Sequence, residues 1–213
     1  MKARFLKLII ITTALSLMPL AHAMAGVFYV CSGTAFTLTP GVSTFAVYEW
    51  SDGATVVQTG SSPNLVQTVT LSPATTAIAK TYNLRVQDAN GCWSAQTSHT
   101  VYVLPALTAS ISGTTAVCSN VTVSETLTAT SNFGTLNLTA ATGLNYAFTW
   151  TGGGTPSGTN NSQNLVTASG TYDVSVAYVL PTNDGSKLSA CNGTASHTIN
   201  TNTAPTTPSV TIQ

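Results

Sequence analysis

The chain repeats itself, and this repetition constrains the fold more than any other feature of the sequence. Five short motifs of the first half return in the same order in the second half, at offsets of 87 to 100 residues. The pairs are Cys31 with Cys118, residues 48–53 with 148–153, residues 81–86 with 171–176, Cys92 with Cys191, and residues 98–100 with 196–198. A longer insertion precedes the last cysteine of the second copy. Two tandem copies of one unit predict two similarly folded domains.

Within each copy the apolar residues follow the period of a β-strand. Apolar and polar residues alternate through residues 82–87 and again through 172–176, which places one face of each strand in a core. Asp-Gly or Asn-Gly pairs at 52–53, 90–91 and 192–193 supply tight turns. Each copy has one central tryptophan, Trp50 or Trp150, which we expect to anchor its core. The sequence therefore predicts an all-β fold of two small antiparallel sandwiches, over residues 26–104 and 105–200, followed by an extended tail at 201–213.

The N-terminal residues 1–25 have the pattern of a cleaved secretory signal. Three basic residues precede an apolar stretch at 8–20, and small residues suited to cleavage follow. The alternative is an uncleaved anchor helix, for which the apolar stretch is short. Cleavage leaves three basic residues against six acidic ones, a net charge of −3. We expect a secreted protein at the cell surface or outside the cell, without a membrane span in the mature chain.

The composition limits the partners that such a protein can have. Charged residues make up 6% of the chain, against about a quarter in an average protein. Nucleic acid is excluded as a partner, because phosphate binding needs clustered lysine and arginine. A monomer that stays dispersed normally carries more charge, so the low charge also favours self-association.

The four cysteines predict two disulfides in an exported chain, with three possible connectivities. We favour Cys31–Cys92 and Cys118–Cys191, because each bond would close one sandwich. The rival pairings cross between the domains and would leave at least one sandwich unclosed.

The first copy resembles the repeats of a known class of surface protein. Residues 82–92, preceded by 48–53, are similar to the signature of PKD-like and immunoglobulin-like (Ig-like) repeats in Bacteroidetes-type secreted bacterial surface proteins. The second copy has no counterpart of residues 88–91 beside Tyr172. The resemblance implies two Ig/PKD-like sandwiches that serve as spacers or adhesive units.

The two ends of the mature chain do not match its middle. Residues 105–113 form an extended segment before the second copy, whereas the first copy starts at Gly26 with this segment missing or short. The tail from 205 to 213 resembles the linker and first strand of a further repeat. We therefore predict that residues 209–213 of one subunit insert into the first sandwich of the next and build a filament. The predicted assembly residues are Val27, Phe28, Val30, Ser209, Val210, Thr211 and Ile212. The alternative is a disordered linker, or a truncated piece of a longer adhesin.

The sequence offers few groups for chemistry, so we expect a non-enzymatic protein without a cofactor or metal. The acidic residues lie mostly at turns. His99 and His197 occupy matching places and are expected to be polar positions on the last strand of each copy. Trp93 has no counterpart in the second copy and is an expected interface or ligand contact. The leading interpretation is a filament or matrix subunit that binds copies of itself. The alternative is an adhesin fragment or a glycan-binding module, with Trp93 and residues 151–162 as its surface and cell-surface glycans or matrix proteins as partners.

Overall fold

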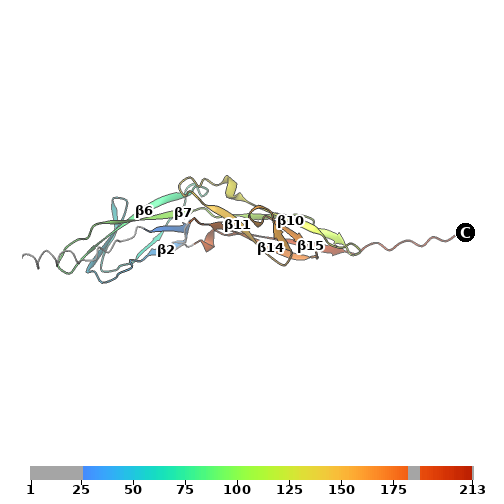
Figure 1. Cartoon of the computed structure of the whole chain (residues 1–213), viewed down its shortest axis with the longest axis horizontal. Coiled ribbons are helices and arrows are strands. Elements are labelled where there is room, and N and C mark those ends of the chain that lie inside the picture. The colour runs from blue at the N-terminus through green and yellow to red at the C-terminus, as the bar shows by residue number, and fades with distance from the viewer. Residues whose placement is uncertain (1–25, 182–187, 213) are drawn as a thin grey trace, which may run out of the picture.

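The computed structural model is an elongated, almost entirely β-stranded chain in which two sandwiches follow one another along the long axis (Figure 1). It describes residues 26–181 and 188–212. The predicted signal at 1–25 lies outside the described residues. The chain crosses from the first sandwich to the second once, at residues 105–108.

The first sandwich is formed by seven strands in two sheets. A five-stranded sheet has the order β1-β7-β6-β3-β4, and a two-stranded sheet pairs β2 with β5. The strands are β1 (Val27–Cys31), β2 (Ala35–Leu38), β3 (Val47–Asp52), β4 (Thr55–Gly60), β5 (Leu65–Thr68), β6 (Ile78–Gln87) and β7 (Thr97–Leu104).

The second sandwich has two four-stranded sheets, with the orders β12-β13-β10-β8 and β11-β14-β15-β9. Its strands are β8 (Ala109–Ser112), β9 (Ala116–Cys118), β10 (Glu125–Ser131), β11 (Asn145–Thr151), β12 (Thr155–Ser157), β13 (Gln163–Val166), β14 (Gly170–Val179) and β15 (Gly193–Asn202). The described parts of its connections contain three short 3-10 helices: η1 (Asn132–Thr135), η2 (Thr159–Asn161) and η3 (Ser189–Cys191).

The alternation of apolar and polar residues along the strands places the apolar side chains inside each sandwich. In the first, Trp50 and Tyr82 are only 1% exposed and pack against apolar residues of β2, β5 and β7. The indole Nε1 of Trp50 donates a hydrogen bond to the carbonyl of Pro63, 2.9 Å away. In the second, Val174 and Val176 are buried while Trp150 is half-buried. Trp50 is confirmed as a core anchor, and the predicted fold class of tandem Ig-like β-sandwiches is confirmed.

The cluster that contains Val174 and Val176 also joins the two sandwiches. Tyr29 and Leu104 of the first sandwich are buried together with Leu107, Phe148 and Cys191 of the second half. Backbone hydrogen bonds cross the joint as well, since the amide of Ala77 donates to the carbonyl of Asn137 at 2.9 Å. The joint is therefore packed like a core, which holds the two sandwiches in line.

The two sandwiches share one plan but differ at one edge. In each, an early strand runs parallel to the last strand: β1 beside β7, and β9 beside β15. In the second sandwich β8 also pairs with β10, and Ile111 lies opposite Ala129. In the part of the first sandwich that the structure describes, β2 pairs with β5 alone. The position that β8 occupies in the second sandwich has no described strand in the first.

Candidate assembly site

A cavity of about 760 Å³ opens at the end of β2, whose second edge has no partner strand within the described residues. Its apolar walls come from both sheets and include Phe28 of β1, Leu38 of β2 and Trp50 of β3. Residues 39–42, which continue from β2, form another wall. Val42 and Phe45 at this rim are 57% and 38% exposed. Unpaired backbone beside exposed apolar side chains is the arrangement that accepts an added strand.

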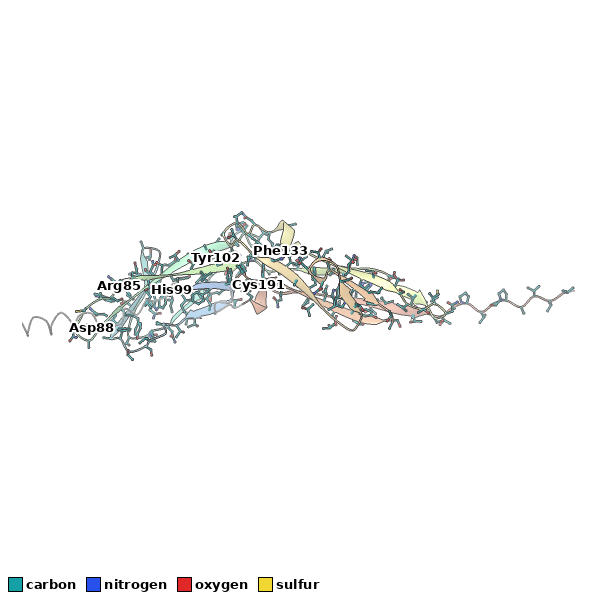
Figure 2. The ribbon with its side chains drawn as sticks, viewed as in Figure 1. Arg85, Asp88, His99, Tyr102, Phe133 and Cys191 are labelled. Carbon is teal, nitrogen blue, oxygen red and sulfur yellow. A yellow bond between two sulfur atoms is a disulfide. The ribbon has the colours of Figure 1, made fainter. Side chains whose placement is uncertain are left out.

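The cavity lies at the outer end of the first sandwich, away from the joint. Strand β7 starts at Thr97, which lines the cavity, and ends at Leu104, which is buried in the joint. Figure 2 places Arg85 and Asp88 at this outer end and Cys191 at the joint. We call this outer end the entry pole, because the chain enters the fold here.

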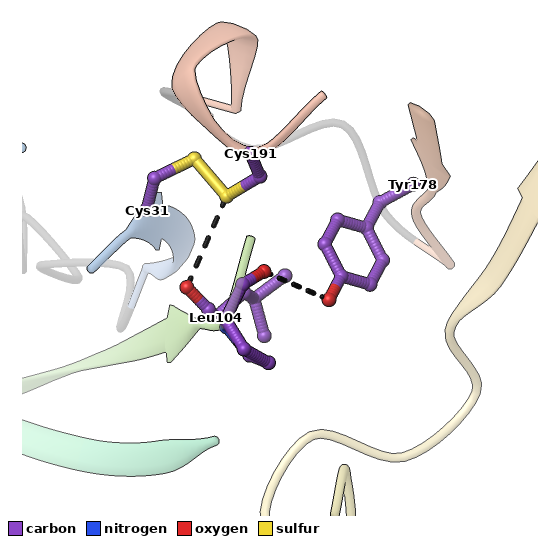
Figure 3. Close-up of a disulfide and its surroundings, with 5 residues drawn as sticks. Cys31, Leu104, Tyr178 and Cys191 are labelled. Carbon is purple, nitrogen blue, oxygen red and sulfur yellow. Dashed lines mark hydrogen bonds between the residues drawn. A yellow bond between two sulfur atoms is a disulfide. The ribbon is translucent and has the colours of Figure 1, made fainter. Parts of the chain in front are cut away.

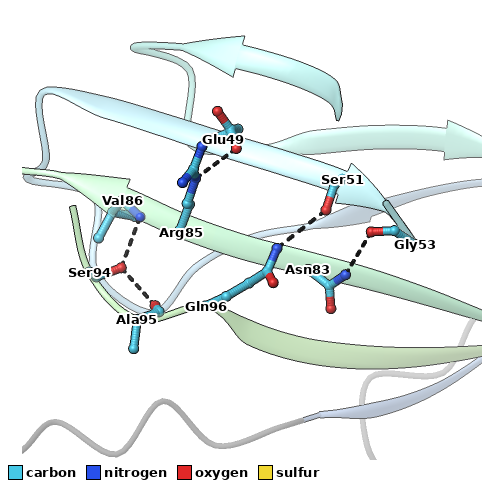
Figure 4. A network of polar contacts seen from close by, with 9 residues as sticks. All are labelled: Glu49, Ser51, Gly53, Asn83, Arg85, Val86, Ser94, Ala95 and Gln96. Carbon is cyan, nitrogen blue, oxygen red and sulfur yellow. Dashed lines mark hydrogen bonds and ion pairs between the residues drawn. The ribbon is translucent and has the colours of Figure 1, made fainter. Parts of the chain in front are cut away.

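Polar side chains line one side of the cavity. Arg85 donates from Nε to Glu49 Oε1 at 2.7 Å, and its guanidinium carbon lies 4.5 Å from the ring centroid of Trp93 (Figure 4 shows the Arg85–Glu49 pair). The hydrogen bond to Glu49 raises the pKa of Arg85 above its ordinary value. The hydroxyl of Ser94 accepts from the amide of Val86 at 3.0 Å. The Trp93 side chain is 40% exposed, and its role as an interface or ligand contact stays a prediction.

The two histidines have structural partners. Gly26 donates its amide to His99 Nδ1 at 3.2 Å, and the His99 ring lies 5.9 Å from Trp50 and 6.2 Å from Phe28, measured between centroids. Burial lowers the pKa of His99 below its ordinary value, because the charged ring would lose hydration. His197 Nε2 lies 2.9 Å from the carbonyl oxygen of Thr114. Both lie on the last strand of their sandwich, β7 and β15, as expected.

The tail lies at the opposite end of the molecule. After β15 ends at Asn202, residues 203–212 form no strand and extend away from the second sandwich (Figure 1). Val210 is 91% and Ile212 is 100% exposed. Ser209 and Thr211 are exposed as well, and Gln213 lies outside the described residues. We call this end the exit pole.

The structure separates the three assembly residues that the sequence placed on β1. Phe28 lines the cavity. Val30 is 2% exposed and packs inside the first sandwich, and Val27 points to the opposite face of β1, toward the cluster at the joint. Three further lining residues that were not predicted, Leu38, Val42 and Phe45, lie on the other side of the cavity. The sequence feature that could have identified them is the series of apolar residues that continues after β2 ends at Leu38.

The predicted disulfide pairing was wrong. The structure joins Cys31 to Cys191 across the joint, with 5.4 Å between their Cα atoms (Figure 3), and leaves Cys92 and Cys118 exposed as free thiols. Cys31 ends β1 at the joint, whereas Cys92 follows β6 at the entry pole. A disulfide needs Cα atoms about 4.4–6.8 Å apart, so cysteines at opposite ends of one sandwich cannot bond. The sequence showed that the cysteines lie near strand ends but not at which end of the sandwich.

The joint is built tightly around this bond. Cys191 accepts at its carbonyl oxygen from the amide of Leu107 at 2.7 Å, and the hydroxyl of Tyr178 donates to the carbonyl oxygen of Pro105 at 3.0 Å. The linker backbone also passes so close to Gly193 that a Cβ there would lie 2.7 Å from the Leu107 oxygen. These contacts hold the linker at 105–108 in place beside the disulfide.

The expected composite surface for a glycan does not form within one copy. Trp93 lies at the entry pole, whereas residues 151–162 belong to the second sandwich, beyond the joint. Within residues 26–181 and 188–212, no group of three or more His, Cys, Asp or Glu side chains could hold a metal ion. No described helix is both long and apolar enough to cross a membrane.

Comparison with solved structures finds other tandem β-domains at low sequence identity. The fibronectin(III)-like modules of Clostridium thermocellum CbhA align with 91% of this chain and 98% of that chain, at 15% identity and a TM-score of 0.43. Three N-terminal domains of the bacteriophage RB49 highly immunogenic outer capsid protein align with 85% of this chain and 68% of that chain, at 11% identity and a TM-score of 0.43. An I-band fragment of titin aligns with 84% of this chain and 64% of that chain, at 10% identity and a TM-score of 0.41. No protein-family profile and no curated protein matches the sequence.

Proposed function

We propose that this chain is a secreted, non-enzymatic structural protein that assembles head to tail into an extracellular filament or matrix. Residues 209–213 of one copy add a strand to the first sandwich of the next copy, beside β2. The chain is related in this role to the PKD-like repeats of Bacteroidetes-type surface proteins that its first copy resembles. The single observation that carries the proposal is an apolar cavity at one pole, beside an edge of β2 that has no partner strand among the described residues, together with two exposed apolar side chains, Val210 and Ile212, at the other pole.

The tail has the pattern that a strand added at this cavity requires. In the second sandwich, residues 109–112 of β8 alternate half-buried and exposed, with Ala109 and Ile111 facing inward. Residues 210–212 repeat this alternation, with Val210 and Ile212 separated by Thr211. Alternate side chains of an added strand point to the same face, so Val210 and Ile212 of one copy enter the cavity of the next together.

The direction of the chain supports the same joint. Residues 105–108 lead from β7, the last strand of the first sandwich, into β8 of the second. Residues 203–209 likewise follow β15, the last strand of the second sandwich. A copy placed beyond the exit pole would receive this tail at its entry pole, in the direction in which β8 enters the second sandwich. The contact between copies then repeats the contact between the two sandwiches of one copy.

Burial of the tail side chains would stabilise the contact between copies, and the position of the two contact surfaces favours an open polymer over a closed dimer. Burial of one valine or isoleucine side chain contributes about 1.5–3 kcal/mol, and both tail side chains are almost fully exposed in the single copy. Ladder hydrogen bonds to β2 would add to this and would cover an edge that otherwise favours aggregation. The two contact surfaces differ and lie at opposite poles, so any assembly keeps one free entry pole and one free exit pole and stays open.

The proposal is tested by deleting residues 209–213 from the processed protein, residues 26–213. Negative-stain micrographs of the parent protein should show filaments, and micrographs of the deletion variant should show single elongated particles. Circular dichroism should show both to be equally folded, because the tail makes no strand in the single copy. Filaments that persist after the deletion would rule out strand donation by the tail.

A binding module remains a second candidate, and the cavity is the observation that favours it. Its volume of about 760 Å³ falls within the range of about 300–1,000 Å³ that is typical of small-ligand sites. Arg85, Ser94 and His99 supply a few polar groups in a mainly apolar lining. A binding module would stay monomeric, and its melting temperature would rise with glycans. The Arg85→Ala variant would lose that rise.

A further inference from the structure

The two free cysteines occupy the same places in their sandwiches as the two bonded ones. Cys31 ends β1 opposite Leu104, the last residue of β7, and Cys118 ends β9 opposite Asn202, the last residue of β15. The backbone hydrogen bonds made by the residues after these two cysteines also correspond. Ser32 donates its amide to Leu104 at 3.0 Å, as Ser119 does to Asn202 at 2.8 Å. Each sandwich therefore has one cysteine at the end where its last strand finishes, which we call the exit of the sandwich.

The other two cysteines, Cys92 and Cys191, lie at the opposite end of their sandwiches, which we call the entrance. Cys191 lies between β14 and β15, and Cys92 lies between β6 and β7, which are the last two strands of each sandwich. Asp88 holds Cys92 in a turn, because its Oδ1 accepts the Cys92 amide at 2.8 Å. Figure 2 places Asp88 at the end of the molecule farthest from the tail. Within one copy, the exit cysteine of the first sandwich, Cys31, is bonded to the entrance cysteine of the second, Cys191.

We propose that the same bond closes the joint between copies: Cys118 of one copy forms a disulfide with Cys92 of the next. This inference rests on the head-to-tail assembly proposed above, in which an exit pole meets an entry pole. Both thiols are exposed in the single copy, whereas Cys31 and Cys191 are buried by the joint that they share. A filament joined in this way has a disulfide at every junction between sandwiches and resists dissociation as one covalent chain.

The bond forms by thiol–disulfide exchange. The thiolate of one cysteine attacks a small-molecule or protein disulfide and releases one thiol. The second cysteine then attacks the mixed disulfide, forms the interchain S–S bond and releases the other thiol. The two cysteines lose two protons and two electrons, and the oxidising disulfide gains them as two thiols. Formation of the existing Cys31–Cys191 bond likewise requires an oxidant that accepts two electrons.

The proposed joint between copies has less room for a close passage of the linker than the joint within a copy. Ser94 stands two residues after Cys92, where Gly193 stands two residues after Cys191. A side chain at Gly193 would meet the linker backbone at 2.7 Å, so the tail cannot pass Ser94 equally closely. The connection at 203–209 is longer than the linker at 105–108, which accommodates the wider passage.

The experiment uses the processed protein, residues 26–213, treated with oxidised glutathione and run on non-reducing denaturing gels. The parent protein should give a ladder of dimers, trimers and longer chains that reductant collapses to monomer. The Cys92→Ser and Cys118→Ser variants should each remain monomeric alone, because each keeps only one end of the bond. A mixture of the two should give a dimer and nothing larger.

Two further measurements separate this inference from the proposed function. Chymotryptic mapping of a mixture of ¹⁵N-labelled and unlabelled protein should find Cys92 of one isotope joined to Cys118 of the other. The C92S/C118S variant should still form filaments in micrographs, but those filaments should dissolve to monomer in detergent without reductant. Cys92–Cys92 or Cys118–Cys118 links, or filaments that stay free of interchain disulfide in oxidised glutathione, would overturn the inference while leaving strand donation intact. Absence of filaments from the parent protein would instead overturn the proposed function.

Discussion

Removing the Cys31–Cys191 disulfide should weaken both sandwiches. The bond joins residues 160 apart in sequence, and closing a loop of that length stabilises a fully folded chain by about 5 kcal/mol on the chain-entropy model. If only the first sandwich unfolds, the loop runs from Cys31 to the linker, roughly 76 residues, and the loss is still about 4.5 kcal/mol. This loss is close to the whole stability of a small domain.

The assay is urea unfolding of the C31S/C191S variant, made in the background that lacks residues 209–213 so that assembly does not contribute. Ring resonances of His99 report the first sandwich and those of His197 report the second, because each lies on the last strand of its own sandwich. We expect both midpoints to fall, with a combined loss of about 4 to 5 kcal/mol. The matched control is C92S/C118S, which removes two exposed thiols that are bonded to nothing in the single copy.

A loss below about 1 kcal/mol in both sandwiches would refute this reasoning. It would mean that the packed cluster at the joint already restrains the chain as fully as the disulfide does. A fall in the control variant would show that the exposed thiols, rather than the bond across the joint, hold the fold.

Two further outcomes follow from individual contacts. Gly193→Ala should destabilise the joint by about 1–3 kcal/mol, because its Cβ would lie 2.7 Å from the backbone of Leu107 and Thr108; Gly134→Ala, which meets open space, should leave the melting temperature nearly unchanged. His99 should titrate by NMR below the ordinary histidine pKa of about 6.5, because burial disfavours its charged form. Since the folded pKa is the lower one, the stability that neutral His99 provides is present above pH 6.5 or so and is lost as the pH falls through the folded pKa. Urea midpoints for the first sandwich should therefore fall between pH 7.5 and pH 5, and midpoints that stay level would contradict the assignment.

Much of the fold could be read from the sequence because local patterns determine it. The alternation through 82–87 and 172–176 identified the strands that became β6 and β14, and the central tryptophans identified the core of the first sandwich. These features depend on side chains within a few residues of each other, and the two tandem copies repeat them. Trp93 was singled out from local sequence, because it follows Cys92 at a hairpin, and it lies just after the turn at 89–90, bridged to Gln87.

The disulfide pairing and the shape of the cavity could not be predicted in this way. Pairing depends on which end of a sandwich each cysteine occupies, and that is set by strand direction and by the packing of one sandwich against the other. The spacing of cysteines along the chain carries no such information. Leu38 and Val42 gained their place at the cavity from the unpaired edge of β2, a property of sheet order that no single strand pattern contains.

The most direct test of the central claim is whether the first sandwich accepts the tail in trans. Isotope-labelled protein without residues 209–213 is titrated with a peptide of residues 203–213 and followed by NMR. We expect shifts at Phe28, Leu38 and the Trp50 indole, together with slowed amide exchange along β2. A peptide with Ile212→Asp should bind about tenfold to a hundredfold more weakly, because a buried isoleucine is worth about 1.5–3 kcal/mol.

A peptide with Thr211→Asp is the charge-matched control and should bind nearly as well as the parent peptide, since Thr211 lies on the opposite face of the strand from Ile212. Equal binding of the Ile212→Asp and parent peptides would contradict strand donation into the cavity. So would shifts confined to the second sandwich.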